Sequence, residues 1–201
     1  MNMKQVLKQC MHAVFLVLTL PLAAVAGFGR FVEGFRFSSQ LCAIAPGVLG
    51  DYLRIAFYRL TLKDCSSNSR ISFGSFFAHP SASVGEGVYI GAYCVLGSCS
   101  IGDRTQIASH VQVLSGRRQH TRDKEGRMTG SEAGEFEQIA IGADSWIGAS
   151  AVVMAPVGAG TTIGAGAVVV KPIEAGVVAV GNPARELTRQ DYVKCQTDNH
   201  H

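Results

Sequence analysis

From residue 84 to residue 169 the chain repeats one pattern, in which an aliphatic residue, usually followed by glycine, returns about every six positions. The hexads VGEGVY, IGAYCV, IGDRTQ and IASHVQ precede a charged interruption, and IGADSW, IGASAV, VGAGTT and IGAGAV follow it. The fifth position of each hexad is small or β-branched. Internal repetition at a short fixed period is typical of a stacked solenoid, in which each repeat contacts only its neighbours.

Each hexad predicts one short strand, and three hexads make one triangular coil with the aliphatic side chains inside. Glycine permits turn conformations at the corners that a Cβ atom would hinder. Stacked coils pair their backbone groups with the coils above and below, which buries parallel ladders of valine and isoleucine. The glycines do not fit a dinucleotide-binding loop, because no G-x-G-x-x-G run opens a helix between two strands. The pattern therefore predicts an all-β solenoid.

The first 62 residues lack the repeat and are expected to form a helical segment. The stretch HAVFLVLTLPLAAVAGFG is apolar over about 14 to 17 residues, short of the roughly 20 that a helix needs to cross a bilayer. Arg30 and Arg36 follow it and lysines precede it, which favours a cytoplasmic location for both ends. Pro21 is expected to kink a helix. We therefore expect a re-entrant or monotopic anchor; the alternative is a signal peptide cleaved after AVA at residues 24–26.

A second helix is predicted from the periodicity of GVLGDYLRIAFYRLTL, residues 47–62. One face carries apolar side chains and the other carries charges; the apolar face holds Leu49, Tyr52, Leu53, Ala56, Phe57 and Leu60, and the charged face holds Asp51, Arg54 and Arg59. A basic amphipathic helix beside an apolar anchor fits a membrane surface. The alternative is an ordinary helix packed on the solenoid.

The chain thus divides into a membrane-associated helical segment at 1–62, a solenoid at 63–187 and a polar tail at 188–201. One long loop, residues 114–138, interrupts the solenoid with the charged sequence SGRRQHTRDKEGRMTGSEAGEFE. Insertions in solenoids emerge as loops on one face, and loops of this length in compact domains are usually functional or disordered.

Charge and cysteine content narrow the possible partners. A formal net charge of +3 gives no broad basic field, so we expect no nucleic-acid partner. The six cysteines are scattered without the paired spacing of zinc sites.

The solenoid resembles the hexapeptide-repeat acyltransferases. The resemblance spans about residues 69–187 and is most specific in IGADSWIGASAVVMAPVGAGTTIGAGAVVVKPI and VAVGNPAREL, which are similar to the end of the sugar O-acetyltransferase branch. It implies a left-handed parallel β-helix, acetyl-CoA as the acyl donor without a metal, and a homotrimer with its active sites between neighbouring subunits.

The resemblance also places a catalytic histidine at His120, inside the loop. A neutral imidazole, with a pKa near 6.5, can take the proton of a sugar hydroxyl as it attacks a thioester and return it to the leaving thiolate. Three residues near it are candidate contacts of the acceptor. Glu137 can accept hydrogen bonds from hydroxyls, Arg117 can meet an anionic saccharide, and His110 can orient the base or touch a substrate.

Five residues match positions of the donor site in the family. The resemblance implies that Ala149 and Ala165 contact the pantetheine arm through backbone groups. It also implies that Lys171 and Arg185 lie near the phosphates and that Trp146 forms an aromatic wall. Ala149 and Ala165 are also corner residues that any β-helix would use. The four-residue stretch VMAP replaces a full hexad, and we expect this shortening to displace the groove locally.

We therefore expect an acetyl-CoA-dependent O-acetyltransferase acting on a sugar hydroxyl of a surface polysaccharide or exopolysaccharide, or of its lipid-linked precursor. Residues 1–62 would hold it at the cytoplasmic face of the bacterial inner membrane. Other readings remain open: an N-acyltransferase on an amino sugar, transfer of a longer acyl group, a γ-carbonic-anhydrase-like metal site using His110 and His120, and a non-catalytic membrane scaffold.

Overall fold

The computed structural model describes residues 3–115, 124–127 and 137–187. Three α-helices and one 3-10 helix come first: α1 (Met3–Val25), η1 (Gly27–Gly29), α2 (Val32–Ala43) and α3 (Gly47–Thr61). Short strands of two or three residues follow: β1 (Asp64–Cys65), β2 (Arg70–Ile71), β3 (Phe76–Phe77), β4 (Ser83–Val84), β5 (Tyr89–Ile90), β6 (Val95–Leu96), β7 (Cys99–Ile101), β8 (Gln106–Ile107), β9 (Gln112–Val113), β10 (Ile139–Ile141), β11 (Trp146–Ile147), β12 (Val152–Val153), β13 (Thr162–Ile163), β14 (Val168–Val169), β15 (Val178–Val180) and β16 (Arg185–Glu186).

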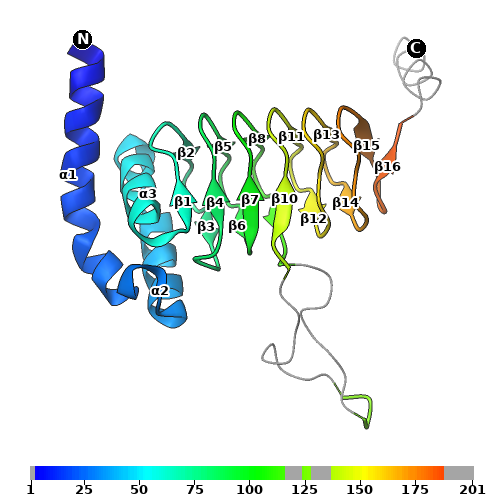
Figure 1. The fold of residues 1–201 in the computed structure, drawn as a ribbon, viewed down its shortest axis with the longest axis horizontal. Coiled ribbons are helices and arrows are strands. Elements are labelled where there is room, and N and C mark those ends of the chain that lie inside the picture. The colour runs from blue at the N-terminus through cyan, green and yellow to red at the C-terminus, as the bar shows by residue number, and fades with distance from the viewer. Residues whose placement is uncertain (1–2, 116–123, 128–136, 188–201) are drawn as a thin grey trace.

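The strands form the three faces of a prism whose long axis runs away from the helices (Figure 1). The first sheet has the order β1-β4-β7-β10, the second β16-β15-β13-β11-β8-β5-β2, and the third β14-β12-β9-β6-β3. Pairing is parallel except between β15 and β16, which are antiparallel. From β1 to β15, consecutive strands therefore belong to different sheets, and each coil stacks on the previous one. The expected solenoid, a left-handed parallel β-helix, is confirmed.

The aliphatic position of each hexad points into the prism, as expected. On the second sheet Ile90, Ile107 and Ile147 are fully buried and stand in register on successive strands. The fifth position is buried as well, and its hydroxyl groups bond the next coil: Thr105 donates to the Gly142 carbonyl over 2.9 Å. A small residue there leaves room for the turn, and a hydroxyl also satisfies a backbone carbonyl at the corner.

The short VMAP corner leaves the strand register unbroken. Four positions separate Val153 on the third sheet from Val157 on the first, and four also separate Val169 from Ile173 one coil later. Parallel bridges join Ile141 to Val157 and Val157 to Ile173. The shortened corner is therefore a repeated feature of the last coils.

Helices α2 and α3 close the N-terminal end of the prism and share its core (Figure 1). The rings of Phe35 and Phe57 stack at 5.9 Å, and the ring of Tyr58 lies edge-on to that of Phe77 in β3 at 5.0 Å. Ser39 of α2 donates to the Phe77 carbonyl over 2.8 Å. One continuous hydrophobic core thus crosses the expected boundary after residue 62.

The orientation predicted for the second helix is wrong at its central arginine. Arg54 is fully buried rather than on an outer charged face, and its guanidinium ties α3 to its surroundings. Its Nη2 donates to Asp51 over 2.7 Å and its Nε to the Ile71 carbonyl over 2.8 Å. Its Nη1 donates to the carbonyls of Cys42 and Ala43, at the end of α2, and to that of Ala45, just past the helix. The helix is packed on the solenoid, as the alternative interpretation held. Arg54 can be buried there because a planar guanidinium can donate to several carbonyls at once.

The first helix is longer than the apolar stretch suggested. Helix α1 has 23 residues and runs through Pro21. Val6–Val25 is long and apolar enough to cross a membrane by length and composition, a test that core helices and signal sequences also pass. The helix packs against α3, and its other face exposes valine and leucine side chains.

Arg54→Met should destabilise the protein by about 3 kcal/mol, because it leaves carbonyls and part of a carboxylate without partners in a buried place. Urea unfolding followed by circular dichroism would measure this loss. Arg59→Met removes the same charge from an exposed position on the same helix and should change stability by less than about 0.5 kcal/mol. Equal losses in the two variants would contradict the structural role of Arg54.

Candidate active site

The inserted loop leaves and re-enters the prism at one corner, between the third and first sheets. It begins after Val113 of β9 and ends before Ile139 of β10. The Glu137 amide donates to the Ser115 carbonyl over 3.2 Å, and the Ile139 amide donates to the Ser98 carbonyl over 3.0 Å. The two ends of the loop therefore lie side by side. Strand β10 still pairs with β7 in register, so the insertion does not disturb the coils.

Three serines stacked along this corner hold the loop root. Ser115 is buried, and its Oγ accepts the Ser98 amide over 2.8 Å. The hydroxyls of Ser98 and Ser81 lie 2.9 Å apart. Gln138, at the exit of the loop, donates to the Ser81 carbonyl over 2.9 Å. These bonds fix where the loop starts and ends relative to three successive coils.

Two residues predicted for this site, His120 and Arg117, lie outside the described residues, so their roles stay predictions. Glu137 is described and exposed at the loop exit. Lys171 is exposed at the same corner of the prism, further toward the C-terminus. The structure therefore brings Glu137 and Lys171 to the edge from which the loop emerges.

His110 lies at a different corner, between the second and third sheets. Its backbone has a positive φ of 62°, and its ring stacks on that of Tyr93 with centroids 5.2 Å apart and planes 15° apart. The third sheet separates this corner from the loop root within one protomer. Sequence reasoning missed Tyr93; its position 17 residues before His110, one coil earlier, is the signal that would have found it.

The predicted donor residues fall at several places on the prism. Ala149 and Ala165 are exposed at the His110 corner, where Ser150 donates to the Ser109 carbonyl over 3.0 Å and Gly166 to the Ala149 carbonyl over 2.8 Å. Trp146 is 57% exposed on the outer face of the second sheet. Arg185 is exposed in β16, at the edge of that sheet, and Lys171 lies across the third sheet. His110, Ala149 and Ala165 thus share an edge, and the other donor candidates do not.

The described part of the chain gives little support for a metal site or for a nucleophilic cysteine. Within residues 3–115, 124–127 and 137–187 no three His, Cys, Asp or Glu side chains form a group that could hold a metal ion. Burial raises the pKa of Cys99 and of Cys65 to about 12, so these thiols are protonated at neutral pH and are poor nucleophiles.

Replacing Ser115 should loosen the loop root. Ser115→Ala leaves the buried Ser98 amide without its acceptor, and we expect a loss of about 1–3 kcal/mol in urea unfolding. Ser81→Ala makes the same chemical change at an exposed member of the stack, where water replaces the lost bond, and should cost less than about 0.5 kcal/mol. A Ser115→Ala protein as stable as the Ser81→Ala protein would show that this bond does not hold the root.

Comparison with known proteins agrees with this geometry. Residues 81–115 match the family model described as bacterial transferase hexapeptide (six repeats). No curated protein sequence matches the chain at a significant level. The polySia specific acetyltransferase NeuO is a similar solved structure, with 26% identity, a TM-score of 0.50, and coverage of 61% of this chain and 58% of that one.

A second similar structure is AntD, an N-acyltransferase from Bacillus cereus, solved in complex with dTDP and 3-hydroxybutyryl-CoA. It has 16% identity, a TM-score of 0.50, and coverage of 69% of this chain and 89% of that one. At this identity the likeness shows the fold alone. Residues 81–115 thus match the hexapeptide repeat of bacterial transferases, and the fold is similar to that of solved acyltransferases.

Proposed function

We propose that this protein transfers an acetyl group from acetyl-CoA to a saccharide hydroxyl, on a surface polysaccharide or exopolysaccharide or on its lipid-linked precursor. The observation that carries the proposal is the root of the loop at residues 114–138. A β-helix has regular faces, and this insertion, tied down by Ser115 and Glu137 at a single corner, is the feature that can wall a cleft beside it.

His120 is the proposed general base. A sugar hydroxyl attacks a thioester poorly because its pKa is far above 7. The neutral imidazole takes the hydroxyl proton as oxygen adds to the acetyl carbon, and the imidazolium then gives that proton to the leaving thiolate. Direct transfer of this kind needs no covalent acyl-enzyme.

A homotrimer is the proposed assembly, and the separation of the candidate residues supports it. The loop root lies at one edge of the third sheet, and His110, Ala149 and Ala165 lie at the other. Contact between edges of neighbouring protomers would let the loop of one protomer face the donor residues of the next. Ala149 and Ala165 would then contact the pantetheine arm, Trp146 would line the groove, and Lys171 and Arg185 would meet the phosphates.

Acetyl transfer to oxygen is preferred to N-acylation because residues 141–173 and 178–187 resemble the sugar O-acetyltransferase branch. The polySia specific acetyltransferase NeuO is similar at 26% identity, whereas the N-acyltransferase AntD is similar in fold alone. Transfer to an amino sugar therefore remains the second candidate, and product analysis separates an ester from an amide by its lability to mild base.

The proposed location is the cytoplasmic face of the inner membrane. Helices α1 and α2 and the turn between them expose large apolar side chains, among them Leu18, Phe31 and Phe37, at 58%, 65% and 61%. An apolar surface of this kind is stabilised when it enters the boundary between lipid headgroups and acyl chains. Because α1 packs on α3, we propose that it lies in the membrane surface rather than across it.

His120→Ala should lower acetyl transfer by about 10²- to 10⁴-fold, the usual contribution of a general base. Labelled acetyl-CoA and a lipid-linked saccharide extract provide the assay, with His200→Ala, a histidine of the C-terminal tail, as the matched control. Transfer by the His120→Ala protein at the control rate would remove the proposed mechanism.

The membrane proposal is best tested without deleting residues 1–62, because that deletion removes the side chains of α2 and α3 that complete the core. Leu18→Glu combined with Phe31→Glu should instead reduce sedimentation with phospholipid vesicles at least about tenfold, since each apolar side chain contributes roughly 1.5 kcal/mol or more when buried. Val95→Glu changes an exposed valine on the third sheet and should sediment like the wild type. Undiminished sedimentation of the double variant would contradict the proposed surface.

A further inference from the structure

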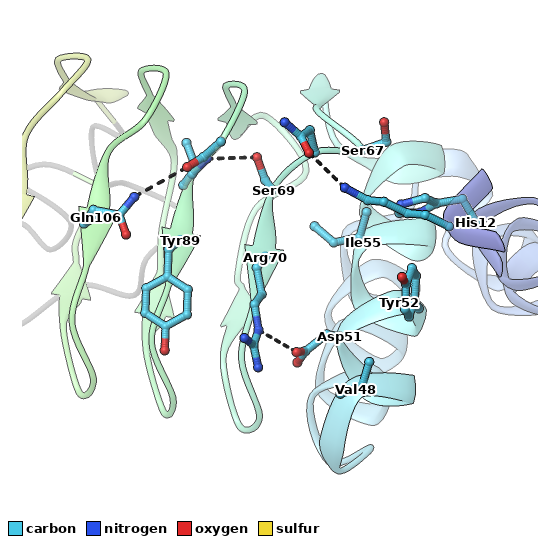
Figure 2. A pocket seen from close by; sticks show the side chains of 14 residues that line it. His12, Val48, Asp51, Tyr52, Ile55, Ser67, Ser69, Arg70, Tyr89 and Gln106 are labelled. Carbon is cyan, nitrogen blue, oxygen red and sulfur yellow. Dashed lines mark hydrogen bonds and ion pairs between the residues drawn. The ribbon is translucent and has the colours of Figure 1, made fainter. Parts of the chain in front are cut away.

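A pocket of about 430 Å³ lies where α1 and α3 meet the second sheet (Figure 2). Helix α1 contributes Lys8 and His12, α3 contributes Tyr52 and Asp51, and the second sheet contributes Tyr89 and Gln106. The acetyl-transfer candidates described above do not line it. Its volume is in the range of small-molecule sites in proteins. It is therefore a separate place to look for a ligand.

The wall of the pocket carries excess positive charge. Asp51 is the only carboxylate among the described lining residues, and it is shared by two arginines, with Arg54 and Arg70 each 2.7 Å from one of its oxygens. Lys8 donates to the neutral Asn68 amide oxygen over 2.9 Å, and the amide nitrogen of Asn68 in turn donates to Glu86 over 3.3 Å. Two cations, Lys8 and Arg70, therefore line the pocket with one carboxylate, and this excess of positive charge favours an anionic ligand.

His12 lines the same pocket and lacks hydrogen-bond partners for its ring nitrogens among the described residues. Both of its ring nitrogens are buried, and neither has a partner among the described residues. Its ring lies edge-on to Tyr52 at 5.0 Å. Burial, and then the charges of Lys8 and Arg59, lower the pKa of His12 below 6.5, so at neutral pH it has one N–H to donate. A buried polar group without a partner is unfavourable in the free protein, and a ligand with an acceptor would supply that partner.

The opposite side of the pocket has different chemistry. Arg70, Tyr89 and Gln106 stand in register on β2, β5 and β8. The Arg70 guanidinium carbon lies 6.0 Å from the centre of the Tyr89 ring. A tyrosine ring beside an amide and a guanidinium offers one apolar surface and several hydrogen-bonding groups, which suits a ring that carries hydroxyls.

We propose that this pocket binds a glycosyl phosphate, with the phosphate beside Lys8 and His12 and the sugar against Tyr89 and Gln106. Such a ligand has two sources, a soluble sugar phosphate or the headgroup of a lipid. Lys8 and His12 belong to α1, whose other face is apolar. If that apolar face lies on the membrane surface, as proposed above, the phosphate of a lipid would reach the pocket from the membrane beside α1. That the bound glycan is the acetyl acceptor rests on the proposed function; binding itself does not.

Isothermal calorimetry with the full chain in detergent tests the site, with glucose 1-phosphate, glucose and inorganic phosphate as probes. Phosphatidylcholine vesicles with and without phosphatidylinositol, a lipid with a phosphate joined to a hydroxyl-rich ring, form the membrane arm. Lys8→Gln and His12→Phe are the variants; the phenyl ring keeps the contact with Tyr52 and removes the N–H. Lys63→Gln removes the same charge from an exposed lysine outside the pocket.

We expect glucose 1-phosphate or the phosphatidylinositol vesicles to bind, with affinity at least about tenfold lower in Lys8→Gln and in His12→Phe and unchanged in Lys63→Gln. Binding only by the vesicles assigns the ligand to the lipid, and binding by the soluble probe shows that the lipid is not required. Binding of inorganic phosphate as tight as that of glucose 1-phosphate would overturn the sugar subsite. No binding in either arm, or binding that Lys8→Gln leaves intact, would overturn the whole proposal.

Acetyl-CoA binding by the same variants keeps this result apart from the proposed function. Lys8→Gln should bind acetyl-CoA as the wild type does, because the pocket shares no residue with the donor candidates. A failure of glycosyl phosphate binding with normal acetyl transfer would therefore overturn the pocket alone.

Discussion

The stacking of inward-pointing aliphatic side chains from coil to coil is the constraint on which the rest of the molecule depends. Ile107 and Ile147 are neighbours on adjacent strands although 40 residues separate them in sequence, because the parallel ladder holds the coils in register. Each fully buried aliphatic side chain contributes about 1.5–3 kcal/mol of transfer free energy. A loop can therefore be inserted at a corner without altering the coils, provided that both of its ends return to the same place.

The periodicity made most of the β-helix predictable from sequence. The hexads fix which side chains point inward. They place Ala149 and Ala165 at the third position of their hexads and His110 at the fourth position of its own, and the structure has all three at one corner. The periodicity does not show at which corner of the prism a residue lies relative to the inserted loop. For that reason sequence reasoning grouped His110 with the loop, whereas the third sheet stands between them.

The helices were harder to predict because their partners are distant in sequence. An amphipathic pattern assigns every charged residue to the outer face, yet Arg54 is buried, since the carbonyls near the end of α2 and at Ile71 need a donor. The pocket beside α1 has the same origin. Lys8 and Asn68 are 60 residues apart, and the helix packing that brings them within 2.9 Å has no local signature.

The central functional claim is that the inserted loop carries the catalytic chemistry and that the β-helix is complete without it. The most direct test replaces residues 114–138 with Gly-Ser, the two residues that join Leu96 to Cys99 at the same corner one coil earlier, and measures transfer of labelled acetyl groups by the purified variant. We predict a protein with the circular dichroism of the wild type, intact acetyl-CoA binding and no saccharide acetylation. Acetylation at the wild-type rate by this folded, loopless protein would contradict the account.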